Sequence, residues 1–182
     1  MIKRLFNRLF PKRYTFEEAC EMAKQHLIEK GAVIGDKVDI VNSTIEDTNA
    51  YLIKIGDNVT IANARILTHD ASTKKIFGYT KVGKVEIGNN VFIGLNSVVL
   101  PGTKIGDNVI VGAGTVCRGN IEGNQVIMGN PYIKICDYET FVEKHKTKAE
   151  KNCYDMDIVE VNDEKNIAQK NELIDKGFGY FL

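Results

Sequence analysis

A six-residue repeat in the middle of the chain constrains its fold more than any other feature. From Ile87 the sequence reads IGNNVF, IGLNSV, VLPGTK, IGDNVI and VGAGTV, so an aliphatic residue opens every block and Gly follows it in four of the five. The full pattern aliphatic–Gly–x–x–(Ser/Thr/Val)–x starts at six positions: 34, 55, 87, 93, 105 and 111. This period matches neither the face of an amphipathic helix nor the alternation of a half-buried strand.

Such a repeat predicts a mainly β solenoid, in which each block forms one short strand and one turn. Three blocks would close a triangular coil, with the aliphatic residues inside and Gly or Asn in turns that need a positive φ. Because one coil cannot bury its apolar face alone, stacked coils must share a core. A Gly-rich sandwich is the alternative, but a sandwich does not hold a six-residue phase over five consecutive blocks.

The repeat loses its phase twice. The first break lies between Ile40 and Ile55, across VNSTIEDTNAYL, and the second lies between Leu67 and Ile87, across residues 68–86. An extra segment cannot enter a stacked column, so each break should leave the solenoid as a loop. Loops on a rigid scaffold often carry the chemistry of a protein.

The two ends of the chain differ from the solenoid, which we expect over residues 31–135. Residues 1–30 should form a helical cap, because Thr15 and Glu18 make a capping box and Gly31 is a typical helix stop. Residues 136–182 should form a helical and irregular tail, with a helix from about Tyr138 to Asn152.

Composition and charge exclude several classes of protein. Lys plus Arg and Asp plus Glu both number 24, so the basic excess typical of nucleic-acid proteins is absent. We expect a cytoplasmic protein with reduced cysteines, because no signal peptide, long apolar run or metal-type cysteine spacing is present. Residues 1–13 carry five basic and no acidic residues among apolar ones. A packed amphipathic helix is the preferred interpretation there, and weak contact with a membrane surface is the alternative.

The repeat, together with ILTHDAS, VGAGTV and MGNPYIKI, resembles the hexapeptide-repeat acyltransferases. The resemblance covers more than half the chain and points to the sugar O-acetyltransferases, of the maltose, galactoside and capsular polysaccharide type. It implies a left-handed parallel β-helix, although the general crossover rule favours the right hand. It also implies acetyl-CoA as acyl donor, a saccharide acceptor, no metal, and a homotrimer with each site between neighbouring solenoids.

His69 is the candidate general base. His26 lies in the predicted cap and His145 in a charged helix, whereas His69 opens the longer phase break. The sugar-acetylating members of the family have a His at this place, where it takes the proton of the acceptor hydroxyl. Imidazole suits that role near neutral pH. Asp70 could orient the ring, and a backbone carbonyl could do the same.

The resemblance also implies where acetyl-CoA binds. The pantetheine amides would meet backbone groups at Gly94, Leu95 and Ala113, although family members often have a small polar residue in place of Leu95. Other candidates for the same ligand are Cys117, Arg118 and Lys134. Arg118 could meet a phosphate. Cys117 replaces a hydroxyl, and Lys134 is displaced from the usual basic position of the closing motif.

The first phase break offers Asn42, Glu46 and Asp47. In galactoside- and maltose-type members of the family an Asn/Asp pair from the preceding coils binds the acceptor sugar, so the resemblance implies Asn42 and Asp47 as acceptor-binding residues. Acetyl transfer to the amine of an amino-sugar nucleotide is an alternative activity, and a non-catalytic solenoid scaffold is an alternative class of function. A carbonic-anhydrase-like site on the same fold needs three histidines on one metal, but only His69 lies in the repeat region. Serine acetyltransferases have a larger helical N-terminal domain than the 30 residues expected here.

Overall fold

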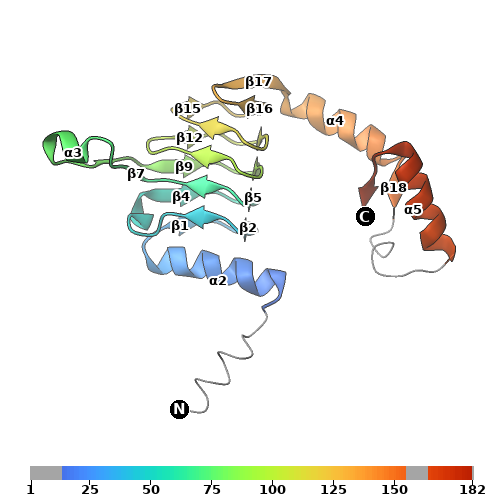
Figure 1. The fold of residues 1–182 in the computed structure, drawn as a ribbon, viewed down its shortest axis with the longest axis horizontal. Coiled ribbons are helices and arrows are strands. Elements are labelled where there is room, and N and C mark those ends of the chain that lie inside the picture. Colours follow the sequence, from blue (N-terminus) through green and yellow to red (C-terminus); the bar gives the residue numbers. More distant parts are fainter. Residues whose placement is uncertain (1–13, 155–163, 182) are drawn as a thin grey trace, which may run out of the picture. The chain divides into compact units, whose positions relative to one another are not determined.

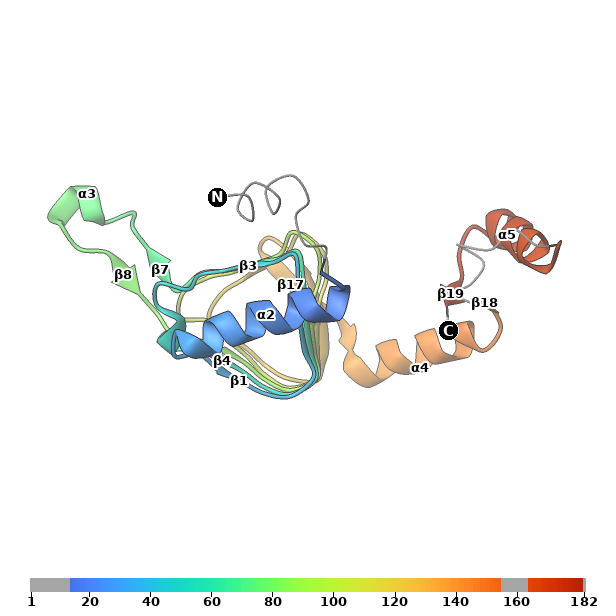
Figure 2. The same cartoon turned by 90° about the horizontal axis from the view of Figure 1, so that it is seen from below.

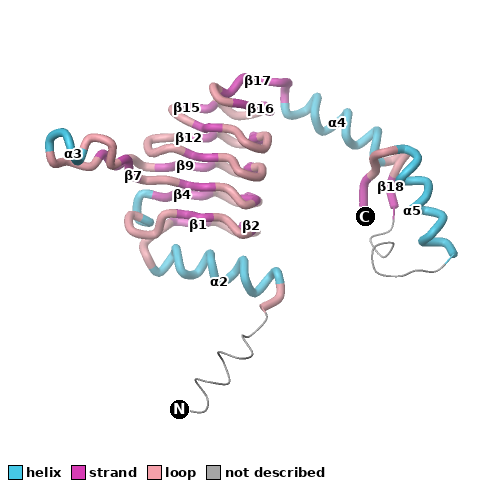
Figure 3. The backbone as a smooth tube through the Cα atoms, viewed as in Figure 1, coloured by secondary structure: helices cyan, strands magenta, loops and turns pink. Residues whose placement is uncertain are grey.

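The computed structural model describes residues 14–154 and 164–181. The chain separates after Tyr138 into two compact units, which are described one at a time. Figures 1 and 3 show that the first unit is a stack of flat coils, as the six-residue period predicted. The membrane-surface prediction for residues 1–13 lies outside the described residues.

Helix α2 (Phe16–Glu29) closes the first end of the stack. Its capping box is confirmed, because the N–H of Glu18 donates to Thr15 Oγ1 at 3.1 Å and the N–H of Thr15 donates to Glu18 Oε2 at 2.9 Å. Cys20 and Leu27 are buried on its inner face. Figure 2 shows α2 lying across the open end of the coils, so the predicted helical cap is confirmed.

Over residues 14–154, each of the first four coils contributes one strand to each of three parallel sheets, and the last coil contributes strands to sheets A and B. Sheet A contains β1 (Val33–Ile34), β4 (Ile53–Ile55), β9 (Val85–Ile87), β12 (Lys104–Ile105) and β15 (Asn120–Ile121). Sheet B contains β2 (Val38–Val41), β5 (Val59–Ala62), β10 (Val91–Ile93), β13 (Val109–Val111), β16 (Gln125–Gly129) and an antiparallel last strand, β17 (Tyr132–Asp137). Sheet C contains β3 (Thr44–Ile45), β6 (Arg65–Ile66), β11 (Val98–Val99) and β14 (Val116–Cys117).

The register confirms that three blocks make one coil. Ile87 pairs with Ile105 and Val99 pairs with Cys117, so equivalent residues lie 18 positions apart. In Figure 2, which looks along the stack from the α2 end, the chain passes from β1 at the lower edge round the right-hand side to β3 at the upper edge. Successive coils recede from the viewer as the chain turns in this sense. The solenoid is therefore a left-handed parallel β-helix.

The aliphatic residues that open the blocks fill the interior. Ile61, Ile93 and Val111 stack on sheet B with no exposed surface, and Ile55, Ile87 and Ile105 stack on sheet A with 1–3% exposed. Burying one such side chain stabilises a fold by roughly 1.5–3 kcal/mol. The interior column is thus the main source of stability for the stack.

A ladder of asparagines lines the corner between sheets A and B. Asn58, Asn90, Asn108 and Asn124 all have a φ between 54° and 59°, the left-handed region that Asn tolerates well. Their side-chain amides form a chain of hydrogen bonds from coil to coil, at 2.8, 2.9 and 2.8 Å. The predicted role of Asn in the turns is confirmed, and the ladder adds contacts between coils.

Both phase breaks lie at the corner between sheets C and A. Ile34 pairs with Ile55, 21 positions away, and the three additional residues accommodate a short helix, η1 (Ala50–Leu52). The second break forms an arm of β7 (His69–Asp70), α3 (Lys74–Phe77) and β8 (Lys81–Val82), which projects from the stack in Figure 1. The predicted loop 68–86 extends too far, because Val85 and Glu86 belong to β9.

The predicted boundary at residue 135 falls inside β17, which turns back along the last coil. The second unit contains α4 (Tyr138–Ala149), β18 (Cys153–Tyr154), α5 (Glu164–Lys176) and β19 (Tyr180–Phe181). His145 is structural, since its Nδ1 lies 2.8 Å from Tyr180 Oη and its ring packs on Phe141. Over residues 14–154 and 164–181, no helix has the length and apolarity needed to cross a bilayer.

Candidate active site

A cleft of about 830 Å³ opens where the arm leaves the corner between sheets C and A. It brings together three residues that the sequence singled out, His69 and Asp70 from β7 and Arg118 from two coils further along. The full lining consists of Leu67, His69, Asp70, Ala71, Lys81, Val82, Gly83, Leu100, Pro101, Gly102, Arg118 and Gly119. The cleft thus combines an imidazole, two cationic side chains and an apolar wall.

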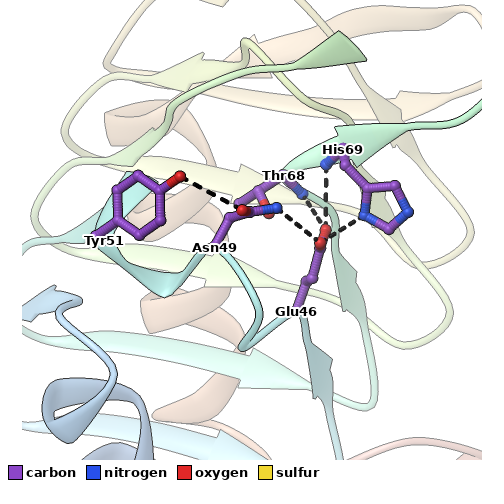
Figure 4. Close-up of polar contacts among 5 residues, drawn as sticks. All are labelled: Glu46, Asn49, Tyr51, Thr68 and His69. Carbon is purple, nitrogen blue, oxygen red and sulfur yellow. Dashed lines mark hydrogen bonds and ion pairs between the residues drawn. The ribbon is translucent and has the colours of Figure 1, made fainter. Parts of the chain in front are cut away.

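The imidazole of His69 is held from behind by Glu46. Its Nδ1 lies 2.5 Å from Glu46 Oε1, and Figure 4 shows Nε2 on the edge of the ring away from that carboxylate. The His69 side chain is 45% exposed, whereas that of Glu46 is 11% exposed. No described residue forms a hydrogen bond with Nε2, so this atom is accessible to a ligand.

Backbone N–H groups hold the Glu46 carboxylate in place. Glu46 Oε2 accepts hydrogen bonds from the N–H of Thr68 at 2.8 Å and from the N–H of His69 at 3.1 Å. Burial by itself would raise the pKa of Glu46, but these donors and the imidazole outweigh it and hold the pKa below its ordinary value. Glu46 is therefore an anion at neutral pH.

Sequence reasoning did not select Glu46, although a signal was present. Ile45 of β3 pairs with Ile66 of β6, so Glu46 is level with Leu67 on the next coil, two residues before His69. A carboxylate at that position of the preceding coil is the observation that would have identified it.

Asp70 does not orient the imidazole, so that expectation was wrong. Its Oδ1 accepts from the N–H of Ser72 at 2.9 Å, and this hydrogen bond holds the pKa of Asp70 below its ordinary value. Asp70 lines the cleft beside His69, but the contact with His69 Nδ1 comes from Glu46 on another coil.

The two acceptor-binding candidates do not meet at the cleft within one chain. Asn42 lies in the turn between β2 and β3, at the corner between sheets B and C, with a φ of 48°. It thus occupies a turn position inside the regular coil. Asp47 Oδ2 lies 2.9 Å from His26 Nε2 on α2, and this contact lowers the pKa of Asp47. The Asp47 carboxylate thus links the cap to the first coil.

Three of the predicted acetyl-CoA positions, Gly94, Leu95 and Ala113, lie together at the corner between sheets B and C. Within the described chain, no hydrogen bond uses the N–H of Leu95 or Ala113, so both groups are available to a ligand. Gly94 also has a structural reason to be glycine. A Cβ there would lie 2.8 Å from the N of Ala113 and from the O of Val111 on the next coil.

Three candidates for contact with acetyl-CoA remain. The prediction for Cys117 was wrong, whereas Arg118 and Lys134 are exposed cations. Cys117 cannot contact a ligand, because its side chain points into the dry interior with 0% exposed, and burial raises its pKa to about 12. Arg118 is exposed in the cleft. Lys134 on β17 forms an exposed ion pair with Asp137 at 2.5 Å. In the part of the chain that the structure describes, no three His, Cys, Asp or Glu residues form a group that could hold a metal ion.

Comparison with known proteins agrees with this geometry. Residues 84–119 match the family model described as bacterial transferase hexapeptide (six repeats). The chain carries the bacterial transferase hexapeptide repeat. This hexapeptide repeat accounts for coils three and four, between β9 and β14.

Similar proteins share about half of the chain. Protein YvoF of Bacillus subtilis (strain 168) is 37% identical over 99 residues, which cover 54% of this chain and 55% of that protein. Galactoside O-acetyltransferase of Escherichia coli (strain K12) is 40% identical over 96 residues, which cover 50% of this chain and 45% of that enzyme. The chain thus spans about half the length of these relatives.

A solved structure with the same fold is a hexapeptide-repeat acetyltransferase from Vibrio cholerae. It aligns with a TM-score of 0.50 and 17% identity, over 69% of this chain and 94% of that chain. The likeness supports the architecture of the stacked coils.

Proposed function

We propose that the chain transfers an acetyl group from acetyl-CoA to a hydroxyl group of a sugar, with His69 as general base. The observation that carries the proposal is the His69 imidazole, held by Glu46 at Nδ1 and accessible at Nε2 beside a cleft. The 40% identity to galactoside O-acetyltransferase over 96 residues supports this choice of reaction.

The chemistry follows from these two nitrogen atoms. The Nε2 lone pair would take the proton of the acceptor hydroxyl as its oxygen attacks the carbonyl carbon of the thioester. The carbon–sulfur bond then breaks, and the imidazolium returns its proton to the departing thiolate. A positioned base of this kind accelerates transfer by roughly 10²- to 10⁴-fold. The Glu46 carboxylate would stabilise the imidazolium that forms between the two steps.

Two parts of the proposed site lie at different corners of one solenoid. His69 and Arg118 are at the corner between sheets C and A, whereas the free N–H groups of Leu95 and Ala113 are at the corner between sheets B and C. A homotrimer would place one corner of each kind side by side, so that neighbouring chains complete each site. Light scattering should give about three times the 20.3 kDa mass of the chain, and a monomer at concentrations that support transfer would contradict this arrangement.

The test of function is an acceptor screen with acetyl-CoA, in which products are identified by mass spectrometry. The panel should contain sugars, oligosaccharides and amino-sugar nucleotides. Acetylation at oxygen supports the proposal, and acetylation only at nitrogen of an amino-sugar nucleotide would replace it with the alternative transfer. If no acceptor is acetylated and acetyl-CoA does not bind, the chain is a non-catalytic scaffold.

A further inference from the structure

We infer that Glu46 is a positioning residue that selects the tautomer of His69, so that Nδ1 carries the hydrogen and Nε2 is the basic atom. This inference rests on the proposed function for its catalytic consequence. The tautomer itself can be measured without any acceptor.

Four hydrogen bonds fix the orientation of the Glu46 carboxylate, as Figure 4 shows. Oε2 accepts from the backbone N–H of Thr68 and of His69, and neither of these donors can rotate away. Oε1 faces His69 Nδ1 at 2.5 Å and accepts from Asn49 Nδ2 at 3.2 Å. Asn49 Oδ1 in turn accepts from Tyr51 Oη at 3.4 Å. Each oxygen position therefore has its own partners.

The tautomer follows from what a carboxylate can do. An ionised carboxylate only accepts hydrogen bonds, so the nitrogen beside Oε1 must be the donor. In a neutral imidazole one nitrogen donates and the other accepts. Nε2 therefore keeps its lone pair, on the edge of the ring that Figure 4 shows turned away from Glu46. This is the atom that the proposed reaction needs as base.

The three additional residues at the first phase break bear on the contact between Glu46 and His69. They lengthen the segment that leads from Glu46 through Asn49 to η1, beside the place where the arm leaves the next coil. The carboxylate comes from one coil and the imidazole from the next, and backbone N–H groups of the second coil join them. The arrangement therefore joins the stacked scaffold to the first residue of the arm, His69 of β7.

Glu46→Gln is the informative variant, because it keeps size and shape. The two backbone donors cannot reorient and require an oxygen at the Oε2 position, whereas the Asn49 amide can turn its oxygen towards residue 46, so the new amide nitrogen should occupy the Oε1 position. That nitrogen donates to Nδ1 and forces the hydrogen onto Nε2, which blocks the base. Glu86→Gln is the matched control, since Glu86 pairs with Lys84 on the outer face of sheet A, outside the lining of the cleft.

The experiment is long-range proton–nitrogen NMR on protein labelled with ¹⁵N-histidine, recorded above about pH 8.5, where imidazoles are neutral. His69→Ala assigns the signals. We expect the Nδ1–H tautomer in the wild type and in Glu86→Gln, and the Nε2–H tautomer in Glu46→Gln. An Nε2–H tautomer in the wild type would overturn the inference, even if Glu46→Gln fails to fold. It would also be overturned if Glu46→Gln keeps the Nδ1–H tautomer.

Kinetics separate this inference from the proposed function. With an accepted sugar, Glu46→Gln should lower kcat by about 10²-fold and leave the KM for acetyl-CoA within about twofold, because a wrong tautomer affects only proton transfer. Wild-type kcat in a folded Glu46→Gln protein would refute the catalytic role of Glu46 and leave the proposed function standing. Absence of transfer by the wild type, with the expected tautomers, would refute the function and leave the tautomer selection standing.

Discussion

Glu46 and His69 are 23 residues apart in the sequence, yet Oε1 of the one lies 2.5 Å from Nδ1 of the other. The contact joins adjacent coils and leaves one nitrogen of the imidazole accessible beside the cleft. Glu46 thereby fixes the orientation of a histidine at the start of a loop, so that the proposed general base presents one defined nitrogen atom.

Replacing His69 with Ala should abolish most of the transfer without unfolding the chain. The side chain is partly exposed and contributes little to the core, so the melting temperature should stay near that of the wild type. Single-turnover rates should fall by roughly 10²-fold or more, while the KM for acetyl-CoA changes little, because the proton moves only in the transition state. Unchanged rates with the best acceptor would remove His69 from the mechanism.

Glu46 should stabilise the fold in a pH-dependent way. Its pKa in the folded chain is lower than the ordinary value of 4.5, so its contribution is fully present above that value and is lost as the pH falls through the folded pKa. The charged partner that faces it is His69. The stability advantage of the wild type over Glu46→Gln should persist above pH 4.5 and shrink as the pH falls below about pH 4. A difference that does not depend on pH would show that the ionised carboxylate does not stabilise the folded state.

Ile105→Asp should prevent folding, because an unpaired carboxylate would enter the closed interior. Ile105→Ala should fold but lose roughly 2–5 kcal/mol of unfolding free energy, as expected for a cavity in a packed core. Lys104→Ala is the control, because the adjacent Lys104 side chain is exposed on the outer face of sheet A. Chemical denaturation of the three variants makes the comparison, and a cooperatively folded Ile105→Asp protein would contradict the inward position.

Arg118→Ala should raise the KM for acetyl-CoA several-fold, equivalent to about 1 kcal/mol, and leave kcat nearly unchanged. The reason is that an exposed guanidinium would meet an anionic group equally in the ground and transition states. Lys54→Ala removes a cation from the outer face of sheet A and provides the control for general charge effects. Arg118 would lose its proposed role if the KM for acetyl-CoA did not change.

The sequence predicted the solenoid because its physical cause is periodic. Ile87, Ile93 and Ile105 repeat at the spacing of strand and turn, and a buried aliphatic residue at each block is the condition for stacking. The same period places Cys117 six residues after the inward Val111, so the burial of Cys117 was predictable. The family resemblance instead suggested Cys117 as a ligand contact, and that prediction was wrong. The position of His69 was predictable because a phase break must leave the column.

The contact with Glu46 was less accessible to sequence reasoning. It depends on how coils one and two align across an insertion, and the six-residue period says nothing about the path of additional residues. Asp70 is adjacent to His69 in the sequence and was therefore the natural partner, but the strand turns its carboxylate towards Ser72. Contacts between coils depend on which residues are stacked on one another. The sequence does not give that register where the repeat is interrupted.

Asn58 and Asn90 are 32 residues apart in the sequence, and the whole arm lies between them in the chain. Their side-chain hydrogen bond is nevertheless 2.8 Å long, the same length as the one between Asn108 and Asn124. The stack therefore continues below and above the arm as though nothing had been inserted. Lengthening a flexible loop costs only about 0.6 kcal/mol per doubling. The corner between sheets C and A, where the arm leaves, is consequently an insertion point at which segments of different length and chemistry can be exchanged beside a fixed imidazole. An engineer who wishes to change the acceptor can replace residues 71–80 as a cassette and leave every coil untouched.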